Sequence, residues 1–141
     1  MVEPELALFT VGYAGRTSDA FVALLEGAGI ERVVDVRAMP ASRQRGFSKG
    51  VLAATLAARG IDYVHVPAAG NPFRGNKSEA ALALYSEHID AHPEVLREIT
   101  AAIRGRRSAL LCLEHDPVGC HRTILARRLL AKKMVHEVRE L

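Results

Sequence analysis

Short apolar runs alternate with stretches of helical periodicity along the whole 141-residue chain. The apolar runs are rich in β-branched residues and are bounded by Gly or Pro, which is typical of buried strands. They predict strands over Leu6–Val11, Arg32–Arg37, Ile61–Val66, Ala109–Leu113 and Val135–Leu141. The periodic stretches predict helices over Thr17–Gly29, Ser48–Arg59, Glu79–Ala91, Pro93–Arg104 and Arg122–Lys133. This alternation indicates βαβ units, so we predict an α/β fold: a three-layer α/β/α sandwich around a mostly parallel, Rossmann-like sheet.

Length and composition favour one domain spanning residues 1–141. The chain is 49% hydrophobic and 25% charged, which is typical of globular proteins and not of disordered ones. A domain of this size folds without disulfides, so we expect Cys112 and Cys120 to be reduced thiols. The sequence has no apolar run near the ~20 residues of a membrane span, and its acidic start is unlike a signal peptide. We therefore expect a cytoplasmic protein with no membrane contact.

The formal net charge of +3 conceals an uneven distribution. Residues 32–49 carry five basic side chains against one acidic side chain, and residues 101–141 carry nine against four. The rest of the chain is acidic. Two separate basic segments indicate an anionic partner. For the C-terminal segment, an equally weighted alternative is that the basic side chains only cover helix surfaces.

Polar residues follow each of the first four predicted strands. In a parallel sheet the carboxyl ends of the strands share one edge, and ligands bind at that edge. We therefore expect the following residues to meet there: Gly12, Tyr13 and Arg16; Arg37, Ser42 and Arg43; His65 and Asn71; and Glu114, His115, Asp116, Cys120, His121 and Arg122.

Three familiar phosphate-binding motifs nearly match and then fail. The stretch Gly12–Gly15 has Ala14 where a dinucleotide site needs its second glycine. The stretch from Gly70 to Ser78 resembles a Walker loop, but Asn76 interrupts it before the lysine. Neither cysteine is followed six residues later by the arginine of a tyrosine phosphatase loop. We predict no cofactor.

The stretch from Leu111 to Arg122 carries the most chemistry. Cys120, His121 and Arg122 are expected at a helix N-terminus, which favours an anion and a cysteine of lowered pKa. Glu114 and His121 are candidates for acid–base catalysis, and Arg122 for binding an anion. The structural alternative is that Cys120 is a buried packing residue and that Arg122 pairs with Glu114 or Asp35.

A metal or redox role is a further alternative, using Cys112, Cys120, His121 and His115. The two cysteines are eight residues apart rather than the two to four of a zinc clip, so we assign no metal ligand. Asp35 lies in a predicted buried strand and needs a partner there. Arg37, two residues on along the same face, is the nearest candidate.

Three stretches of the sequence, taken together, resemble the DUF488 family (domain of unknown function 488). They are Thr10–Arg16; Asp35–Arg43 with Phe47 and Ser48; and Leu111–Glu114 with Cys120–Arg122. The strand end Tyr63–Pro67 also matches, so the resemblance covers nearly the whole chain in order. It implies a small prokaryotic α/β protein and names no activity.

The leading hypothesis is a domain that binds a phosphate-bearing small molecule, such as a nucleotide or sugar phosphate, at the carboxyl ends of the strands. Hydrolase or transferase catalysis is left open. The expected anion-binding residues are Gly12, Tyr13, Arg16, Arg37, Ser42, Arg43, Ser48 and Arg122, and the expected catalytic residues are Glu114, Cys120 and His121. One alternative is a nucleic-acid-binding module that grips a backbone with the basic loop 37–49 and stacks a base on Phe47. Another is a homodimer paired through its C-terminal strand.

Overall fold

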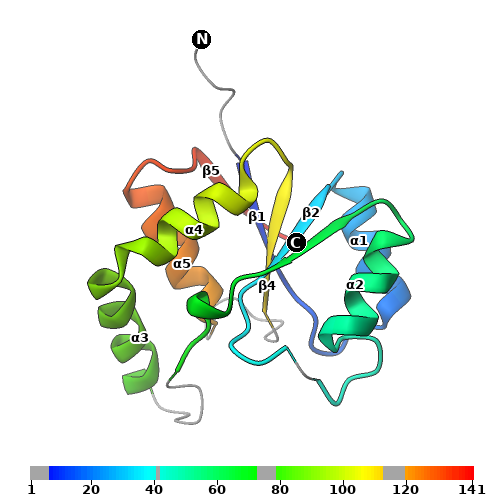
Figure 1. Ribbon diagram of the computed structural model, residues 1–141, viewed down its shortest axis with the longest axis horizontal. Helices are drawn as coiled ribbons and strands as arrows, with labels where there is room; N and C mark the ends of the chain where they lie inside the picture. The colour runs from blue at the N-terminus through cyan, green and yellow to red at the C-terminus, as the bar shows by residue number, and fades with distance from the viewer. Residues whose placement is uncertain (1–6, 41, 73–78, 113–119) are drawn as a thin grey trace.

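A five-stranded sheet forms the centre of the structure (Figure 1). This computed structural model describes residues 7–40, 42–72, 79–112 and 120–141. The strands are β1 (Ala7–Gly12), β2 (Arg32–Asp35), β3 (Asp62–His65), β4 (Ser108–Cys112) and β5 (Glu137–Glu140), in the order β3-β2-β4-β1-β5. Every neighbouring pair is parallel. The predicted α/β fold is thus confirmed, with a sheet that is parallel throughout.

Helices cover both faces of this sheet (Figure 1). Helices α1 (Ser18–Gly27) and α2 (Lys49–Ala57) lie on one face, and α4 (Pro93–Ile103) and α5 (His121–Ala131) lie on the other. Helix α3 (Glu79–Ala91) packs against α4 and α5, and a short 3-10 turn, Pro67–Ala69, follows β3. Each face has its own buried apolar cluster, one including Phe21 and Leu52 and the other including Leu96 and Leu125. The expected three layers are therefore present.

The local sequence explains where these elements begin and how deeply they are buried. Thr17 caps α1 by accepting a hydrogen bond from the backbone N–H of Ala20 at 3.1 Å. All five residues of β4 are buried, as expected of a central parallel strand covered on both faces. Strand β2 ends at Asp35 rather than at Arg37, because the Arg37 N–H donates to the Asp35 carboxylate at 3.0 Å.

The crossover connections diverge between β4, the middle strand of the sheet, and its neighbour β1. The chain leaves β1 through α1 on one face and leaves β4 through α5 on the other face. Gly12 and Cys112, the last residues of β1 and β4, are register partners. Parallel sheets bind ligands at such a switch point, outside the carboxyl ends of the strands. The topology therefore marks the edge at the bottom of Figure 1 as the place to examine.

Among the residues that the structure describes, none of the helices is long and apolar enough to cross a membrane.

Candidate functional site

Two cysteines and a histidine meet where β4 ends and α5 begins. Cys112 is the last residue of β4, Cys120 is the N-cap of α5, and His121 is the first residue of that helix. The Nδ1 atom of His121 lies 3.4 Å from the Sγ atom of Cys112. The donor atoms of all three side chains lie within 4.8 Å of one another. The argument from sequence spacing against a metal site therefore fails, because the fold brings the strand end beside the helix start.

The imidazole of His121 is held in one orientation. Its Nε2 atom lies 2.8 Å from the carbonyl oxygen of Val36. A carbonyl only accepts, so Nε2 carries the hydrogen, and in the neutral ring Nδ1 has the free lone pair. The Tyr85 ring packs edge-on against the imidazole, with centroids 5.2 Å apart, and the Tyr85 hydroxyl donates to the carbonyl of Ala69 at 2.6 Å. The lone pair of Nδ1 thus faces Cys112.

The pKa of Cys120 differs from the prediction. A hydrogen bond with Cys112 and the burial of the side chain raise the pKa of the Cys120 thiol, and the opposing effect of His121 is smaller. The residue is only 2% exposed. The predicted lowering of this pKa at the helix N-terminus is wrong, because burial and the neighbouring thiol outweigh the helix dipole. The structure instead holds Cys120 as a protonated thiol at neutral pH.

Arg122 is fully buried at the start of α5. Its Nη2 atom donates to Oε2 of Glu140, in β5, at 3.2 Å. Arg122 therefore has a structural partner, as the alternative interpretation predicted, and that partner is Glu140. Pairing of Arg122 with Glu114 stays a prediction. Glu114, the third predicted catalytic residue, lies outside the described residues, as do His115 and Asp116.

Asp35 and Arg37 form the buried ion pair that the sequence predicts. The Arg37 Nε atom donates to the two carboxylate oxygens at 2.9 and 3.1 Å, and Nη2 donates at 2.7 Å. The other arm, Nη1, donates to the Tyr13 hydroxyl at 3.2 Å and to the Phe47 carbonyl at 2.7 Å. The guanidinium therefore faces the protein interior and holds the following loop in place. A direct role in binding an anion stays a prediction for Arg37.

Three aromatic side chains anchor the loop that follows β2. Phe47 is fully buried, stacks on Tyr13 with ring centroids 4.5 Å apart, and meets Phe21 edge-on at 5.2 Å. On the other side of the ion pair, the Tyr63 hydroxyl donates to the Asp35 carboxylate. Phe47 is thus a core residue, so the idea that it stacks a nucleic-acid base is wrong. Tyr13 is 2% exposed and serves the same packing.

Hydrogen bonds also close the loop over residues 42–48 on itself. The Ser42 N–H donates to Ser48 Oγ at 3.1 Å, and Ser48 Oγ donates to the Ser42 carbonyl at 3.2 Å. The side-chain amide of Gln44 donates to the carbonyls of Tyr13, at 2.9 Å, and Arg16. These contacts occupy much of the hydrogen-bonding capacity of the predicted anion ligands Ser42 and Ser48. Arg43, by contrast, is exposed, as are Arg45 and Lys49.

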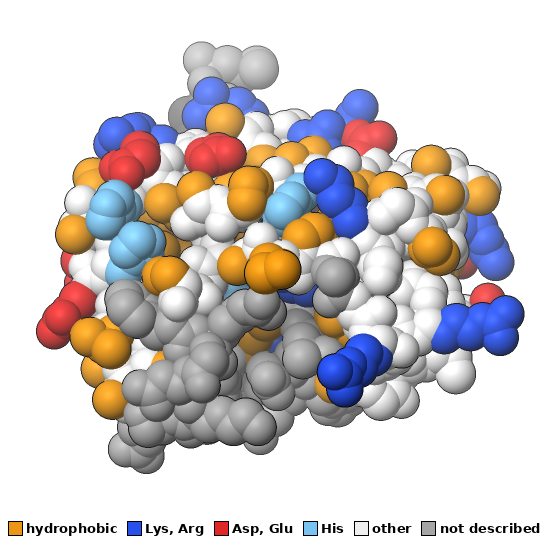
Figure 2. Space-filling model, turned by 60° about the horizontal axis from the view of Figure 1, so that its bottom comes forward, with side chains coloured by type: hydrophobic (Ala, Val, Ile, Leu, Met, Phe, Trp, Pro, Cys, Tyr) orange, Lys and Arg blue, Asp and Glu red, His pale blue; other side chains and the backbone are white. Residues whose placement is uncertain are grey.

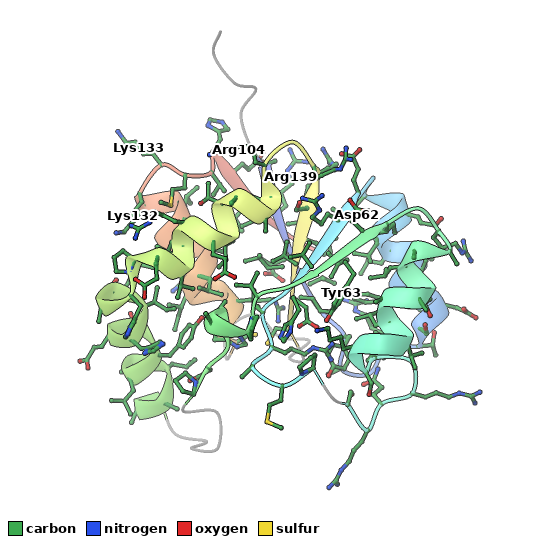
Figure 3. The ribbon with its side chains drawn as sticks, in the orientation of Figure 1. Asp62, Tyr63, Arg104, Lys132, Lys133 and Arg139 are labelled. Carbon is green, nitrogen blue, oxygen red and sulfur yellow. The ribbon has the colours of Figure 1, made fainter. Side chains whose placement is uncertain are left out.

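The remaining predicted residues also lie at this edge. Arg16 is partly buried, and its Nε donates to the Gly12 carbonyl at 2.9 Å. His65 Nε2 donates to the Arg37 carbonyl at 2.8 Å, and Asn71 is buried. Figure 2, which brings this edge forward, shows basic side chains on the side of α1 and α2. The labelled Arg104, Lys132, Lys133 and Arg139 lie at the opposite end, so these four residues of the C-terminal basic segment are remote from this site (Figure 3).

The sequence interpretation missed Tyr63 and Glu140 as members of the site. It named Cys112 only in the metal or redox alternative and then assigned no metal ligand, although the place of Cys112 at a strand end before Cys120 and His121 was an available signal. Tyr63 and Glu140 carry no local signal, because their partners lie 28 and 18 residues away along the chain.

Comparisons with known proteins add a family and a fold. The family model described as "Domain of unknown function DUF488" matches residues 17–129. The comparison with curated proteins finds no match. Two crystal structures described as a putative phosphatase (DUF442) from Shewanella putrefaciens CN-32 each align with 94% of this chain. One has a TM-score of 0.48, 15% identity and 67% of its own chain covered, and the other has 0.46, 14% and 70%.

Proposed function

The chain belongs to the DUF488 family, and we propose that it binds a phosphate-bearing small molecule, such as a nucleotide or sugar phosphate, at the carboxyl edge of its sheet. One observation carries this proposal: α5 begins at the switch point between β1 and β4, and Cys120 makes no side-chain cap hydrogen bond there. The first N–H groups of a helix carry partial positive charge and bind phosphate oxygens. The edge thus offers a place for an anion.

Residues around that helix start favour the same ligand. Gly12 is the register partner of Cys112, and it carries no side chain at the end of β1. Arg122, in the first turn of α5, adds a buried positive charge. This charge is paired with the carboxylate of Glu140, whose side chain is 37% exposed. Arg16 lies after β1 at the same edge.

The loop after β2 supplies exposed positive charge. Arg43, Arg45 and Lys49 are exposed on a segment that the Ser42–Ser48 hydrogen bonds and the buried Phe47 hold in a defined shape. A preorganised loop loses less conformational entropy on binding than a free one. We therefore infer that this loop contributes long-range attraction and peripheral phosphate contacts.

The proposal is one of binding and assigns no catalytic step. Both ring nitrogens of His121 are engaged, with Val36 and Cys112, and Cys120 is a buried thiol of raised pKa. Neither group is thus placed as a ready acid, base or nucleophile toward a ligand at the edge.

Isothermal titration calorimetry tests the proposal. The protein, in chelator-treated buffer, is titrated with inorganic phosphate, a panel of nucleotides and a panel of sugar phosphates. We expect a phosphate compound to bind wild type, and the variant Arg43→Ala with Arg45→Ala to bind it at least about tenfold more weakly, which is about 1.4 kcal/mol. The matched control, Arg104→Ala with Lys132→Ala, removes the same charge from the opposite end and should bind like wild type. Binding by no compound, or equal losses in both variants, would overturn the proposal.

A nucleic-acid partner is the second candidate, favoured only by the exposed basic residues of the same loop. The burial of Phe47 removes the aromatic platform on which it relied. An oligonucleotide added to the same titration, at two salt concentrations, distinguishes the candidates, because backbone binding weakens steeply with salt.

A further inference from the structure

We propose that Cys112, Cys120 and His121 form a binding site for a divalent, thiophilic metal ion of the zinc class. This site lies at the start of α5, and the proposal does not depend on phosphate binding there. It rests on the convergence of two thiols and one imidazole nitrogen from the end of a strand and the beginning of a helix.

The distances between the donor atoms suit a single ion. Zinc bonds of about 2.3 Å to sulfur and about 2.0 Å to nitrogen place tetrahedral ligands roughly 3.5–3.8 Å apart. The His121 Nδ1 and Cys112 Sγ atoms are already 3.4 Å apart, and every pair in the cluster lies within 4.8 Å. Small side-chain movements of about 1 Å or less therefore complete the geometry, with no change in the fold.

The histidine is prepared as a ligand by its second nitrogen. Metal-binding histidines almost always donate their other N–H to a carbonyl or carboxylate, which fixes the tautomer and the ring plane. Nε2 of His121 makes this bond to the Val36 carbonyl at 2.8 Å, and the edge-on Tyr85 ring restricts rotation further. A histidine that only filled space would not need its free lone pair aimed at a cysteine.

Charge and burial indicate a divalent ion. Cys112 and Cys120 are 4% and 2% exposed, and neither forms a disulfide. Two thiolates and one neutral imidazole together carry a charge of about −2, which a divalent cation neutralises in a buried site. Binding follows the balance M²⁺ + 2 R–SH → M(SR)₂ + 2 H⁺, so each ion displaces two thiol protons and no electrons move.

The alternative use of the same pair is a reversible disulfide between Cys112 and Cys120. That reaction releases two protons and two electrons and requires an oxidant, whereas metal binding requires none. Only metal binding uses all three donor atoms of the cluster, so the convergence of two thiols and an imidazole nitrogen favours the metal.

Cobalt substitution of the 141-residue chain tests the site. The protein is reduced with a phosphine, stripped with a chelator, and titrated with Co²⁺ alone in a phosphate-free buffer. We expect one ion per chain, the visible absorption of tetrahedral cobalt, and thiolate-to-cobalt charge-transfer bands. We also expect release of two protons per Zn²⁺ bound, which needs no variant and so does not depend on whether variants fold.

Variants assign the ligands. Cys112→Ser and Cys120→Ser should each lose about half of the charge-transfer intensity, and His121→Ala should bind Co²⁺ at least about tenfold more weakly. His92→Ala, an exposed histidine near the start of α4, is the matched control and should behave like wild type. Circular dichroism establishes that each variant is folded.

Three outcomes would overturn the proposal: no uptake of Zn²⁺ or Co²⁺ at micromolar concentration, a cobalt spectrum without thiolate bands, or cysteine variants that bind as wild type does. Failure of metal uptake together with a Cys112–Cys120 disulfide under mild oxidation would assign the pair to redox chemistry. Phosphate binding is measured separately, on the metal-free protein. A failure of metal binding is therefore distinguishable from a failure of phosphate binding.

Discussion

Arg37 encloses the carboxylate of Asp35 with three hydrogen bonds from its guanidinium, and both side chains are withdrawn from solvent. The two residues are only two positions apart, at the point where β2 ends and the basic loop begins. The same guanidinium reaches across to Tyr13 and to the carbonyl of Phe47. A single ion pair therefore links the end of β2, the loop after β1 and the anchor of the loop at residues 38–48.

Asp35→Asn should be strongly destabilising. The substitution leaves the buried Arg37 charge without its counter-ion, which costs about 3–5 kcal/mol of unfolding free energy. Asp62→Asn, in an exposed pair with Arg32, should cost less than about 1 kcal/mol. Urea unfolding of the two variants measures both values, and equal losses would contradict the role given to the pair.

Alkaline pH should weaken the fold partly through Tyr63. Burial and the hydrogen bond to Asp35 raise the pKa of the Tyr63 hydroxyl above its usual value of 10.0. Unfolding then releases a proton above about pH 10, so stability is fully present below that pH and falls as pH rises. The loss is up to about 1.4 kcal/mol per pH unit for each such tyrosine.

The variant Tyr63→Phe isolates this contribution. Between about pH 8 and 9 the stability of Tyr63→Phe should differ from that of wild type by a constant amount. In that range the Tyr63 hydroxyl titrates in neither the folded nor the unfolded state. Above about pH 10 its curve should be the shallower one, while Tyr85, whose pKa burial also raises, keeps its own contribution. Parallel curves over the whole range would exclude a shifted pKa for Tyr63.

Phe47→Ala should release the basic loop as well as destabilise the protein. The side chain is fully buried between Tyr13 and Phe21, so its removal costs about 3–5 kcal/mol. Met39→Ala, in the same loop but 61% exposed, should change stability by about 0.5 kcal/mol or less. Native-state trypsin cleavage after Arg43 or Arg45 should be faster in Phe47→Ala alone, and similar rates in both variants would contradict the anchor.

Gly70 allows the loop after β3 to touch the loop after β2. A Cβ atom at Gly70 would lie 2.3 Å from the Cα atom of Ala38, so Gly70→Ala should cost about 1–3 kcal/mol through steric displacement of the backbone. Gly50, inside α2, has open space around it, so Gly50→Ala should raise stability by up to about 1 kcal/mol. Thermal unfolding compares the two, and changes of the same sign would refute the close approach.

Much of the fold could be predicted from the chain alone because the signals are local. The β-branched run at Val33, Val34 and Val36 and the capped helix after Thr17 each encode their own conformation. The alternation of such units then requires parallel pairing and right-handed crossovers. The ends of the strands differ from the predicted ends by one or two residues where a side chain binds a backbone group that the sheet would otherwise use. At the end of β2, for example, the Asp35 carboxylate accepts the backbone N–H of Arg37.

The candidate site was predictable only in part. The edge at which Gly12 and Cys112 end side by side follows from strand direction, since parallel strands must end together. Strand direction did not predict which side chains face that edge and which face the core. Tyr13 and Phe47, for example, stack in the core although they are 34 positions apart in the chain.

The sequence by itself determined the elements, their order, the parallel sheet and the short-range Asp35–Arg37 pair, because each depends on residues close together in the chain. Only the tertiary structure decided that Cys112, Cys120 and His121 form one cluster and that Arg122 pairs with Glu140. These contacts depend on strand order and helix placement, which non-local packing selects. Cys112 and Cys120 are neighbours because the end of β4 and the start of α5 lie together at the switch point of the sheet. The number of residues between the two cysteines does not predict this proximity.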